Sequence, residues 1–283
     1  MRTGRFLLGS FLAALLLLGA LEGVLRLAGF HREASPVVIR FGYPDPREIV
    51  DLFRPDPRLF WTFRPGTVFD AEFPVPINAG GYRGRMPADP RPAGLLRVAV
   101  MGDSVAFGAA ASWPEILEGD LATALAGRPA EILNFGVPGY TVVQGLRQYE
   151  DRVGGLAPDV VIIAYGWNDH WLAHGGLPDA ERRFPSRRMA TLASHLTRLR
   201  VVQALHALLP SPVPDTGVRG GQSSPGGDDD GRPGGTDDGS AASAVARGAI
   251  VRRVSPHLFR RSLDTFIGQV RATGARPVVV TLP

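Results

Sequence analysis

The chain contains no cysteine and no lysine. Without cysteine there are no disulfides and no thiolate metal sites. Cysteine usage therefore does not indicate whether the protein is located in an oxidising or a reducing compartment. Because lysine is also missing, all 31 basic residues are arginine, and with 27 acidic residues the formal net charge is only +4. The arginines are scattered along the chain instead of forming one basic block. A nucleic-acid partner is therefore not expected, since such a partner requires clustered positive charge.

Long uncharged runs are also scarce, but Phe6–Leu21 has sixteen residues without a charge, preceded by Arg2 and Arg5. The run is shorter than the ~20 residues of a typical membrane span and slightly longer than the ~7–15 residues of a signal-peptide core. A cleavage site at Leu18–Ala20 would place leucine where the peptidase prefers a small residue. We therefore expect residues 1–30 to be an uncleaved anchor with its arginines in the cytoplasm, and a cleaved signal peptide is the alternative. Both place the following chain outside the cytoplasm, in the periplasm or at the cell surface, and cleavage would make it a secreted protein.

The rest of the chain divides by composition. Residues 31–94 are rich in proline and aromatic residues and are interpreted as a collar, whereas residues 95–283 alternate between strand-like and helix-like patterns. Within the latter, residues 210–245 are mostly Gly, Pro, Ser and Asp, which predicts a disordered insert. Alternating elements indicate an α/β fold with a mostly parallel sheet covered by helices on both faces. We expect strands at 95–102, 131–137, 159–166 and 276–283, and helices at 112–127, 141–153, 188–209 and 257–273.

Small and hydrogen-bonding residues follow the first three predicted strands, at Gly102–Ser104, Asn134–Thr141 and Tyr165–His170. In such a sheet, ligands bind outside the carboxyl ends of the strands. A serine hydroxyl can attack a carbonyl there, while glycine N–H groups and an asparagine amide can donate to the oxyanion that forms. These residue types therefore predict an acyl-transfer site.

Three blocks in this order resemble the SGNH, or GDSL-type, hydrolase family: Gly102-Asp103-Ser104 with Gly108, Asn134-x-Gly136-x-x-Gly139, and Gly166-x-Asn168-Asp169. The resemblance implies a flavodoxin-like three-layer α/β/α domain behind the N-terminal hydrophobic helix. It also implies that Ser104 is the nucleophile. The backbone N–H groups of Ser104 and Gly139 and the side chain of Asn168 would form the oxyanion hole. Neither a metal nor a cofactor is implied.

Other residues of these blocks would support the site. Gly102, Asp103 and Asp169 stand beside the implied catalytic residues. Asp103 is expected to hold the turn through backbone hydrogen bonds, and Asn134 is expected to be structural. Trp167 has two interpretations, as a wall of the acyl or alcohol pocket and as a packing residue.

The sequence departs from the family pattern in its general base. The family's base is a histidine in an Asp-x-x-His block, and none of the six histidines here has aspartate three residues before it. A serine without a base is a poor nucleophile, so we interpret the chain as a fragment that ends before that block. His170 is a weak substitute, because it shares a strand end with Asn168. A zinc site at His170 and His174 is not expected, since Trp171 stands where the metalloprotease pattern needs glutamate.

The predicted helix at 188–209 is amphipathic and contains His195 and His206. We expect its apolar face to pack on the sheet, and a second membrane contact is the alternative.

Together these features predict a membrane-anchored serine esterase that cleaves carboxylic esters, including O-acetyl esters, through an acyl-enzyme outside the cytoplasm. Its partners would be an ester-bearing small molecule or an acylated glycan. One alternative is an O-acyltransferase on cell-envelope glycans, in which a sugar hydroxyl replaces water. Another is a non-catalytic binding protein that keeps the fold without the base.

Overall fold

The structure is a computed structural model of the chain. It describes residues 2–31, 42–44, 50–69, 74–125, 127–173, 176–182, 186–208 and 251–281. The chain divides into two compact units, residues 1–34 with 195–240 and residues 35–194 with 241–283. The predicted insert at 210–245 lies outside the described residues. The division into segments 1–30, 31–94 and 95–283 stays a prediction.

The first unit contains the helices α1 (Arg2–Leu27) and α8 (Arg200–Leu208). Within α1, the stretch Gly9–Leu27 has a mean hydropathy of 1.8 and is long and apolar enough to cross a membrane, a property that signal sequences share. Glu22 connects the two helices, because its Oε2 accepts a hydrogen bond of 3.0 Å from the backbone N–H of Val201. This N–H has no partner within its own helix, so Glu22 caps the start of α8.

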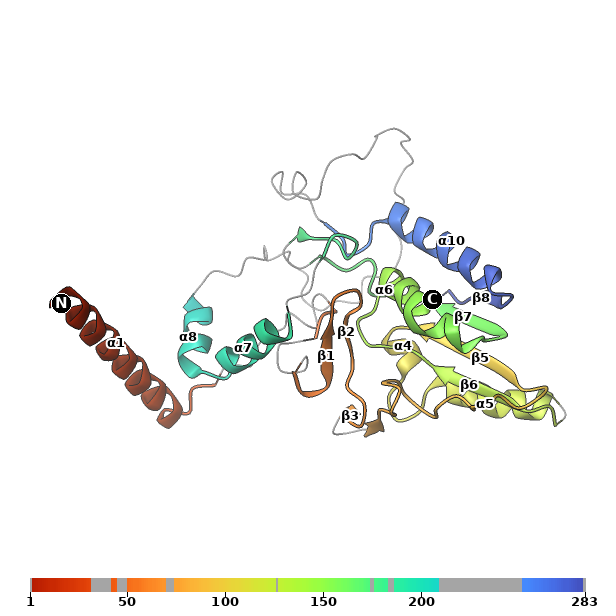
Figure 1. Cartoon of the computed structure of the whole chain (residues 1–283), viewed down its shortest axis with the longest axis horizontal. Helices are drawn as coiled ribbons and strands as arrows, with labels where there is room; N and C mark the ends of the chain where they lie inside the picture. Colours follow the sequence, from red (N-terminus) through yellow and green to blue (C-terminus); the bar gives the residue numbers. More distant parts are fainter. Residues whose placement is uncertain are drawn as a thin grey trace, which may run out of the picture. The chain divides into compact units, whose positions relative to one another are not determined.

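The helix predicted over 188–209 is interrupted. It forms α7 (Arg187–Thr197) and α8, shown as separate helices in Figure 1. The backbone N–H of Leu199 bonds to the carbonyl of Leu196 over 3.0 Å, a tight turn that ends α7. Met189, Leu192 and Leu196 of α7 are exposed. The expectation that this apolar face packs on the sheet is therefore wrong.

The second unit is built on a sheet of four parallel strands in the order β6-β5-β7-β8 (Figure 1). The chain enters at the central strand β5, moves outward to β6, and then returns to the other side of β5. This flavodoxin-like order confirms the predicted fold class. The strands are β5 (Leu96–Gly102), β6 (Ala130–Asn134), β7 (Val160–Ala164) and β8 (Arg276–Val279).

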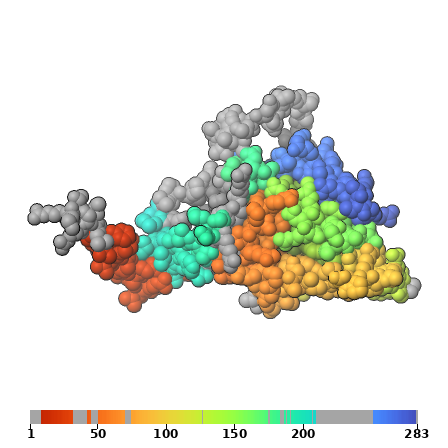
Figure 2. All heavy atoms as spheres, viewed as in Figure 1, coloured from red at the N-terminus to blue at the C-terminus, as the bar shows by residue number. Residues whose placement is uncertain are grey.

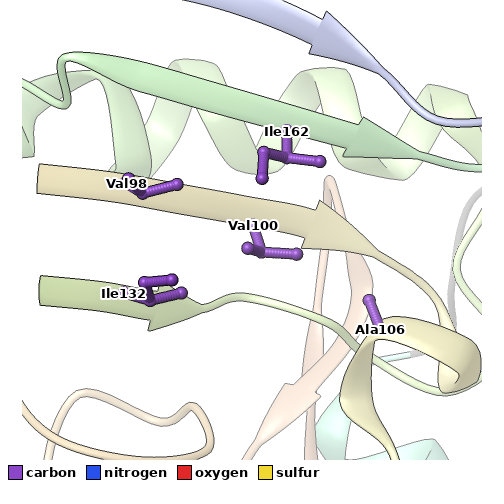
Figure 3. Close-up of a cluster of buried hydrophobic side chains, with 5 residues drawn as sticks. All are labelled: Val98, Val100, Ala106, Ile132 and Ile162. Carbon is purple, nitrogen blue, oxygen red and sulfur yellow. The ribbon is translucent and has the colours of Figure 1, made fainter. Parts of the chain in front are cut away.

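Helices cover both faces of the sheet. Figure 3 shows the cluster of Val98, Val100, Ile132 and Ile162 with Ala106, and α5 packs on it through Trp113, Leu117 and Leu121. The alternate strand residues Ala99, Met101, Val161 and Ile163 are buried as well. By strand alternation these residues point to the opposite face, where α6 lies against β5 and α10 against β8. The helices are α4 (Ser104–Phe107), α5 (Trp113–Ala124), α6 (Val142–Gln148), which continues as a π-helix over Tyr149–Val153 and a 3-10 helix over Gly154–Leu156, and α10 (Pro256–Ala272).

Local sequence explains where these helices begin. A capping box of Ser112 and Glu115 starts α5, and an equivalent box of Thr141 and Gln144 starts α6. In such a box, the side chains satisfy backbone N–H groups that the first turn leaves unpaired. The hydroxyl of Ser255 accepts a hydrogen bond of 3.3 Å from the N–H of Leu258 at the start of α10.

Residues 50–76 form two small antiparallel sheets, β1 (Phe53–Asp56) with β2 (Phe60–Phe63), and β3 (Val68–Phe69) with β4 (Val75–Pro76). The ring of Phe63 stacks on that of Phe107 in α4, with centroids 5.1 Å apart. In the space-filling view, the orange residues of this segment lie directly against yellow and green residues of the sheet unit (Figure 2). The segment predicted as a collar therefore packs against the strand ends where the site was expected.

Candidate active site

Ser104 follows a sharp turn at the end of the central strand. A side chain at Gly102 would place its Cβ 2.5 Å from the Cβ of Ala106 and 2.9 Å from the carbonyl oxygen of Ala164, so the turn requires glycine. The Oδ1 atom of Asp103 then accepts a hydrogen bond of 2.9 Å from the N–H of Val105 and starts α4. Asp103 thus has the predicted turn-holding contact, and Ser104 is left exposed at the first position of this short helix.

Asn168 lies after the third strand and is buried. Its Nδ2 donates to Oδ2 of Asp103 over 3.2 Å and to the carbonyl oxygen of Tyr140 over 3.1 Å. These bonds join the ends of three strands. An amide nitrogen has two hydrogens, so a bound oxyanion would share or replace one of these acceptors.

Gly139 lies in the loop between β6 and α6 with φ of +82°, a conformation that favours glycine. A Cβ at this position would be 2.2 Å from the carbonyl oxygen of Gly42 and 3.1 Å from the ring of Trp61. The N-terminal segment therefore approaches this loop so closely that any other residue would collide with its backbone. Asn134, at the end of β6, donates from Nδ2 to the carbonyl oxygen of Ala106 over 2.8 Å, a structural role as expected.

Ser104, Gly139 and Asn168 line one cavity of about 250 Å³. The structure therefore brings together the three residues that the family resemblance selected from three separate blocks. Trp167 also lines the cavity and is half exposed. The other aromatic lining residues are Tyr43, Phe53, Phe69 and Trp171.

Sequence reasoning missed the contribution of residues 42–44, Phe53 and Phe69 to this cavity. Their aromatic content was visible, but a proline-rich segment without periodicity does not show which loop it will contact. Trp171 was also missed as a lining residue. Its indole N–H is buried without a hydrogen-bond partner among the described residues.

Asp169 is buried beside this cavity and does not line it. Its Oδ1 accepts a hydrogen bond of 3.0 Å from the N–H of Val142 at the start of α6. Its Oδ2 is buried without a partner in the described part of the chain. Burial raises the pKa of Asp169 to about 7, and it also raises the pKa of Asp103.

His170 lines a neighbouring pocket of about 460 Å³, together with Asp169, and does not line the cavity of Ser104. Its Nδ1 lies 3.3 Å from the carbonyl oxygen of Gly166. This placement agrees with the expectation that His170 does not face Ser104. Within the residues that the structure describes, no histidine lines the cavity of Ser104, and His174 lies outside them.

A buried ion pair that sequence reasoning did not find lies behind the glycine loop. The side chains of Arg253 and Asp179 are both fully buried, with 2.8 Å between Nη2 and Oδ2. Arg253 Nη1 donates to the carbonyl oxygens of Gly139 over 2.8 Å and of Gly42 over 3.2 Å. The arginine therefore fastens the loop at Gly139 to the N-terminal segment that covers it.

Other side chains complete the environment of this ion pair. Asp179 accepts hydrogen bonds from the hydroxyls of Tyr43, over 2.5 Å, and Thr141, over 2.9 Å. Arg253 Nη2 also donates to Oε1 of Gln144 over 3.0 Å. An arginine beside a second arginine, a few residues after the predicted insert at 210–245, resembles a surface charge, so the sequence contains no signal for this role.

A serine beside backbone and amide donors, at one edge of a parallel α/β/α sheet, is the arrangement of an acyl-hydrolase site. A model of the GDSL-like lipase/acylhydrolase family matches residues 100–283. The chain belongs to that family, which confirms the resemblance seen in the three sequence blocks. The family is described as one of lipases and acylhydrolases.

Solved structures provide further comparisons. TesA is 16% identical over 66% of this chain, with a TM-score of 0.33, and a GDSL-like lipase from Parabacteroides merdae is 12% identical over 66%, also with 0.33. The chain covers 62% and 58% of the lengths of these two proteins, less than two thirds of each. The acetylxylan esterase Axe2 from Geobacillus stearothermophilus is 26% identical over 27% of this chain and 41% of its own, with a TM-score of 0.23. Among curated proteins there is no match.

Proposed function

We propose that this protein is a serine esterase that cleaves carboxylic esters through an acyl-enzyme on Ser104. The observation that carries the proposal is the common cavity of Ser104, Gly139 and Asn168, which come from the ends of three different strands. A nucleophile and its oxyanion donors must face the same carbonyl group, and this arrangement permits it.

In the proposed reaction, Ser104 Oγ attacks the ester carbonyl carbon and gives its proton to a base. The carbonyl oxygen becomes an oxyanion, which accepts hydrogen bonds from the N–H groups of Ser104 and Gly139 and from Asn168 Nδ2. Collapse of this intermediate breaks the bond to the alcohol oxygen, which leaves with a proton, and the acyl group stays on Ser104. Water then repeats the same steps, releasing the carboxylic acid and restoring the serine.

The size and lining of the cavity favour a short acyl group. Its volume of about 250 Å³ is below the ~300–1,000 Å³ of typical ligand pockets. Half-exposed Trp167 offers a flat apolar surface for the leaving alcohol at the rim. With residues 1–30 as an anchor, the site would lie outside the cytoplasm, where O-acetylated envelope glycans are suitable substrates.

The test uses a fluorophosphonate, which phosphonylates an activated serine and releases fluoride. Because no histidine among the described residues lines the cavity, imidazole is added to the full chain as a diffusible base. We expect imidazole to accelerate labelling, and mass spectrometry to place the label on Ser104. Asn168→Ala should slow labelling by about 10²-fold, the effect of losing one oxyanion donor.

Two variants make the outcome specific. Ser104→Ala should abolish the label, whereas Ser186→Ala, at an exposed serine before α7, should label like the unmodified chain. A chain that is folded by circular dichroism but shows no label on Ser104 at any imidazole concentration contradicts the proposal. That result would favour the non-catalytic binding protein.

A further inference from the structure

The helix α7 presents an apolar stripe that the structure leaves uncovered. Met189, Leu192 and Leu196 follow each other at intervals of three and four residues and are 56%, 51% and 43% exposed. This spacing places them on one side of the helix. In α8, Leu205 and Leu208 are 54% and 81% exposed. Exposed apolar residues gathered on one side of a helix mark an interaction site.

Across α7, α8 and the short turn between them, the charge is of one sign. Residues 186–208 contain four arginines and neither aspartate nor glutamate. Two of the arginines, Arg188 and Arg198, are exposed. A helix with an apolar stripe and a basic polar face is typical of segments that lie in the plane of a membrane surface, where phosphate groups meet the acyl chains.

The contact between α8 and α1 fixes the level at which α8 begins, relative to a bilayer that α1 would span. α1 is helical from Arg2 to Leu27, so the seventeen steps from Arg5 to Glu22 rise about 26 Å at 1.5 Å per residue. This length is close to the hydrocarbon thickness of a bilayer, about 30 Å. If Arg5 lies in one headgroup region, Glu22 reaches the other. Glu22 caps the start of α8 through Val201, so α8 begins at the level of the second headgroup region.

We propose that α7 and α8 lie in the headgroup region of an anionic phospholipid bilayer, on the side away from Arg2 and Arg5. The exposed leucines enter the boundary of the acyl chains, and the arginines bind lipid phosphates. The inference rests on the proposed anchor and is independent of the chemistry at Ser104. It makes this pair of helices a second membrane contact.

The absence of cysteine makes the test direct, because each introduced cysteine is the only one in the chain. We would label single-cysteine variants at Leu192, Leu196 and Leu205 with an environment-sensitive fluorophore. The full chain is placed in vesicles of phosphatidylcholine with phosphatidylglycerol, containing a nitroxide on the lipid acyl chain as quencher. Asp264→Cys, at an exposed position of α10, is the control. The three leucine positions should shift to the blue and be quenched, while the control is not.

The role of the arginines is tested separately. Arg188→Gln combined with Arg198→Gln should lower the membrane-inserted fraction by up to about fivefold per arginine, the contribution of one basic residue near an anionic surface. Arg261→Gln combined with Arg271→Gln, on the exposed face of α10, should change nothing. Vesicles of phosphatidylcholine alone should show less quenching than anionic vesicles.

Three results would overturn the inference. Quenching equal to that of the Asp264 control would show that the stripe faces water. A blue shift without lipid quenching would show that protein, such as a second copy of the chain, covers it. Equal quenching in neutral and anionic vesicles would remove the role of the net negative charge of the lipid.

Discussion

Replacing Asp169 by asparagine should stabilise the protein at neutral and basic pH. The buried carboxyl has a pKa of about 7 in the folded protein, compared with an ordinary value of 3.8. Between these values, the folded protein holds a proton that the unfolded chain has released. Stability must therefore fall as the pH rises through this window, since the unfolded state binds fewer protons.

The size of the effect follows from the shift. About three pKa units at 1.36 kcal/mol each correspond to roughly 4 kcal/mol, present below pH ~4 and lost by pH ~8. In Asp169→Asn the side chain stays neutral and keeps an oxygen that can accept the hydrogen bond from Val142. The variant should therefore exceed the unmodified protein by about 4 kcal/mol at pH 8 and match it within about 1 kcal/mol at pH 4.

Denaturant unfolding of the full chain in detergent measures this difference, with tryptophan fluorescence as the signal. All four tryptophans belong to the second unit, so they report on the unit that contains Asp169. Asp264→Asn, at an exposed carboxyl, should give a pH profile parallel to that of the unmodified chain. The reasoning is refuted if the difference in free energy of unfolding between Asp169→Asn and the unmodified protein stays constant from pH 4 to pH 8. Burial would then not raise the pKa of the Asp169 carboxyl.

Two further variants test the packing behind the site. Gly139→Ala adds a Cβ 2.2 Å from a backbone oxygen at φ of +82°, and should lower the free energy of unfolding by more than the roughly 1–2 kcal/mol of the left-handed conformation alone. The control Gly94→Ala, at φ of +76° with nothing within 4 Å of its Cβ, should cost only that amount. Equal losses of stability in denaturant unfolding would disprove the collision. Arg253→Met leaves Asp179 buried without its cation and should cost about 3–5 kcal/mol. The neighbouring Arg252→Met, at an exposed arginine, should stay within about 0.5 kcal/mol, and a similar loss in both would argue against the buried ion pair.

The sequence predicted the sheet well because β5, β6 and β7 are short apolar runs that are almost entirely buried, while the edge strand β8 is a similar apolar run with exposed valines. Periodicity located β5, β6, β7 and β8 to within a few residues at their ends. Strand ends of a parallel sheet meet at one edge, so residues of three distant blocks could be expected in one cavity.

The parts that escaped prediction depend on contacts between segments far apart in the chain. The Ser104–Phe107 helix is a single turn whose form depends on Asp103, and no periodicity can reveal four residues. The role of Arg253 depends on Gly139 and Asp179, which are more than seventy positions away. The break between α7 and α8 was also missed, because the hydrophobic pattern continues across it.

The connection of Arg253 to Asp179 and the glycine loop has a consequence for biosynthesis. A ribosome makes Gly42, Gly139 and Asp179 first, and Arg253 follows Asp179 by 74 residues. At 5–20 residues per second, this interval lasts about 4–15 s. During that time the emerging chain has a carboxylate to be buried without its cation, and the loop at Gly139 lacks the arginine that holds it. Translation thus delays assembly of the site until residues on the far side of the Gly- and Asp-rich stretch have been made.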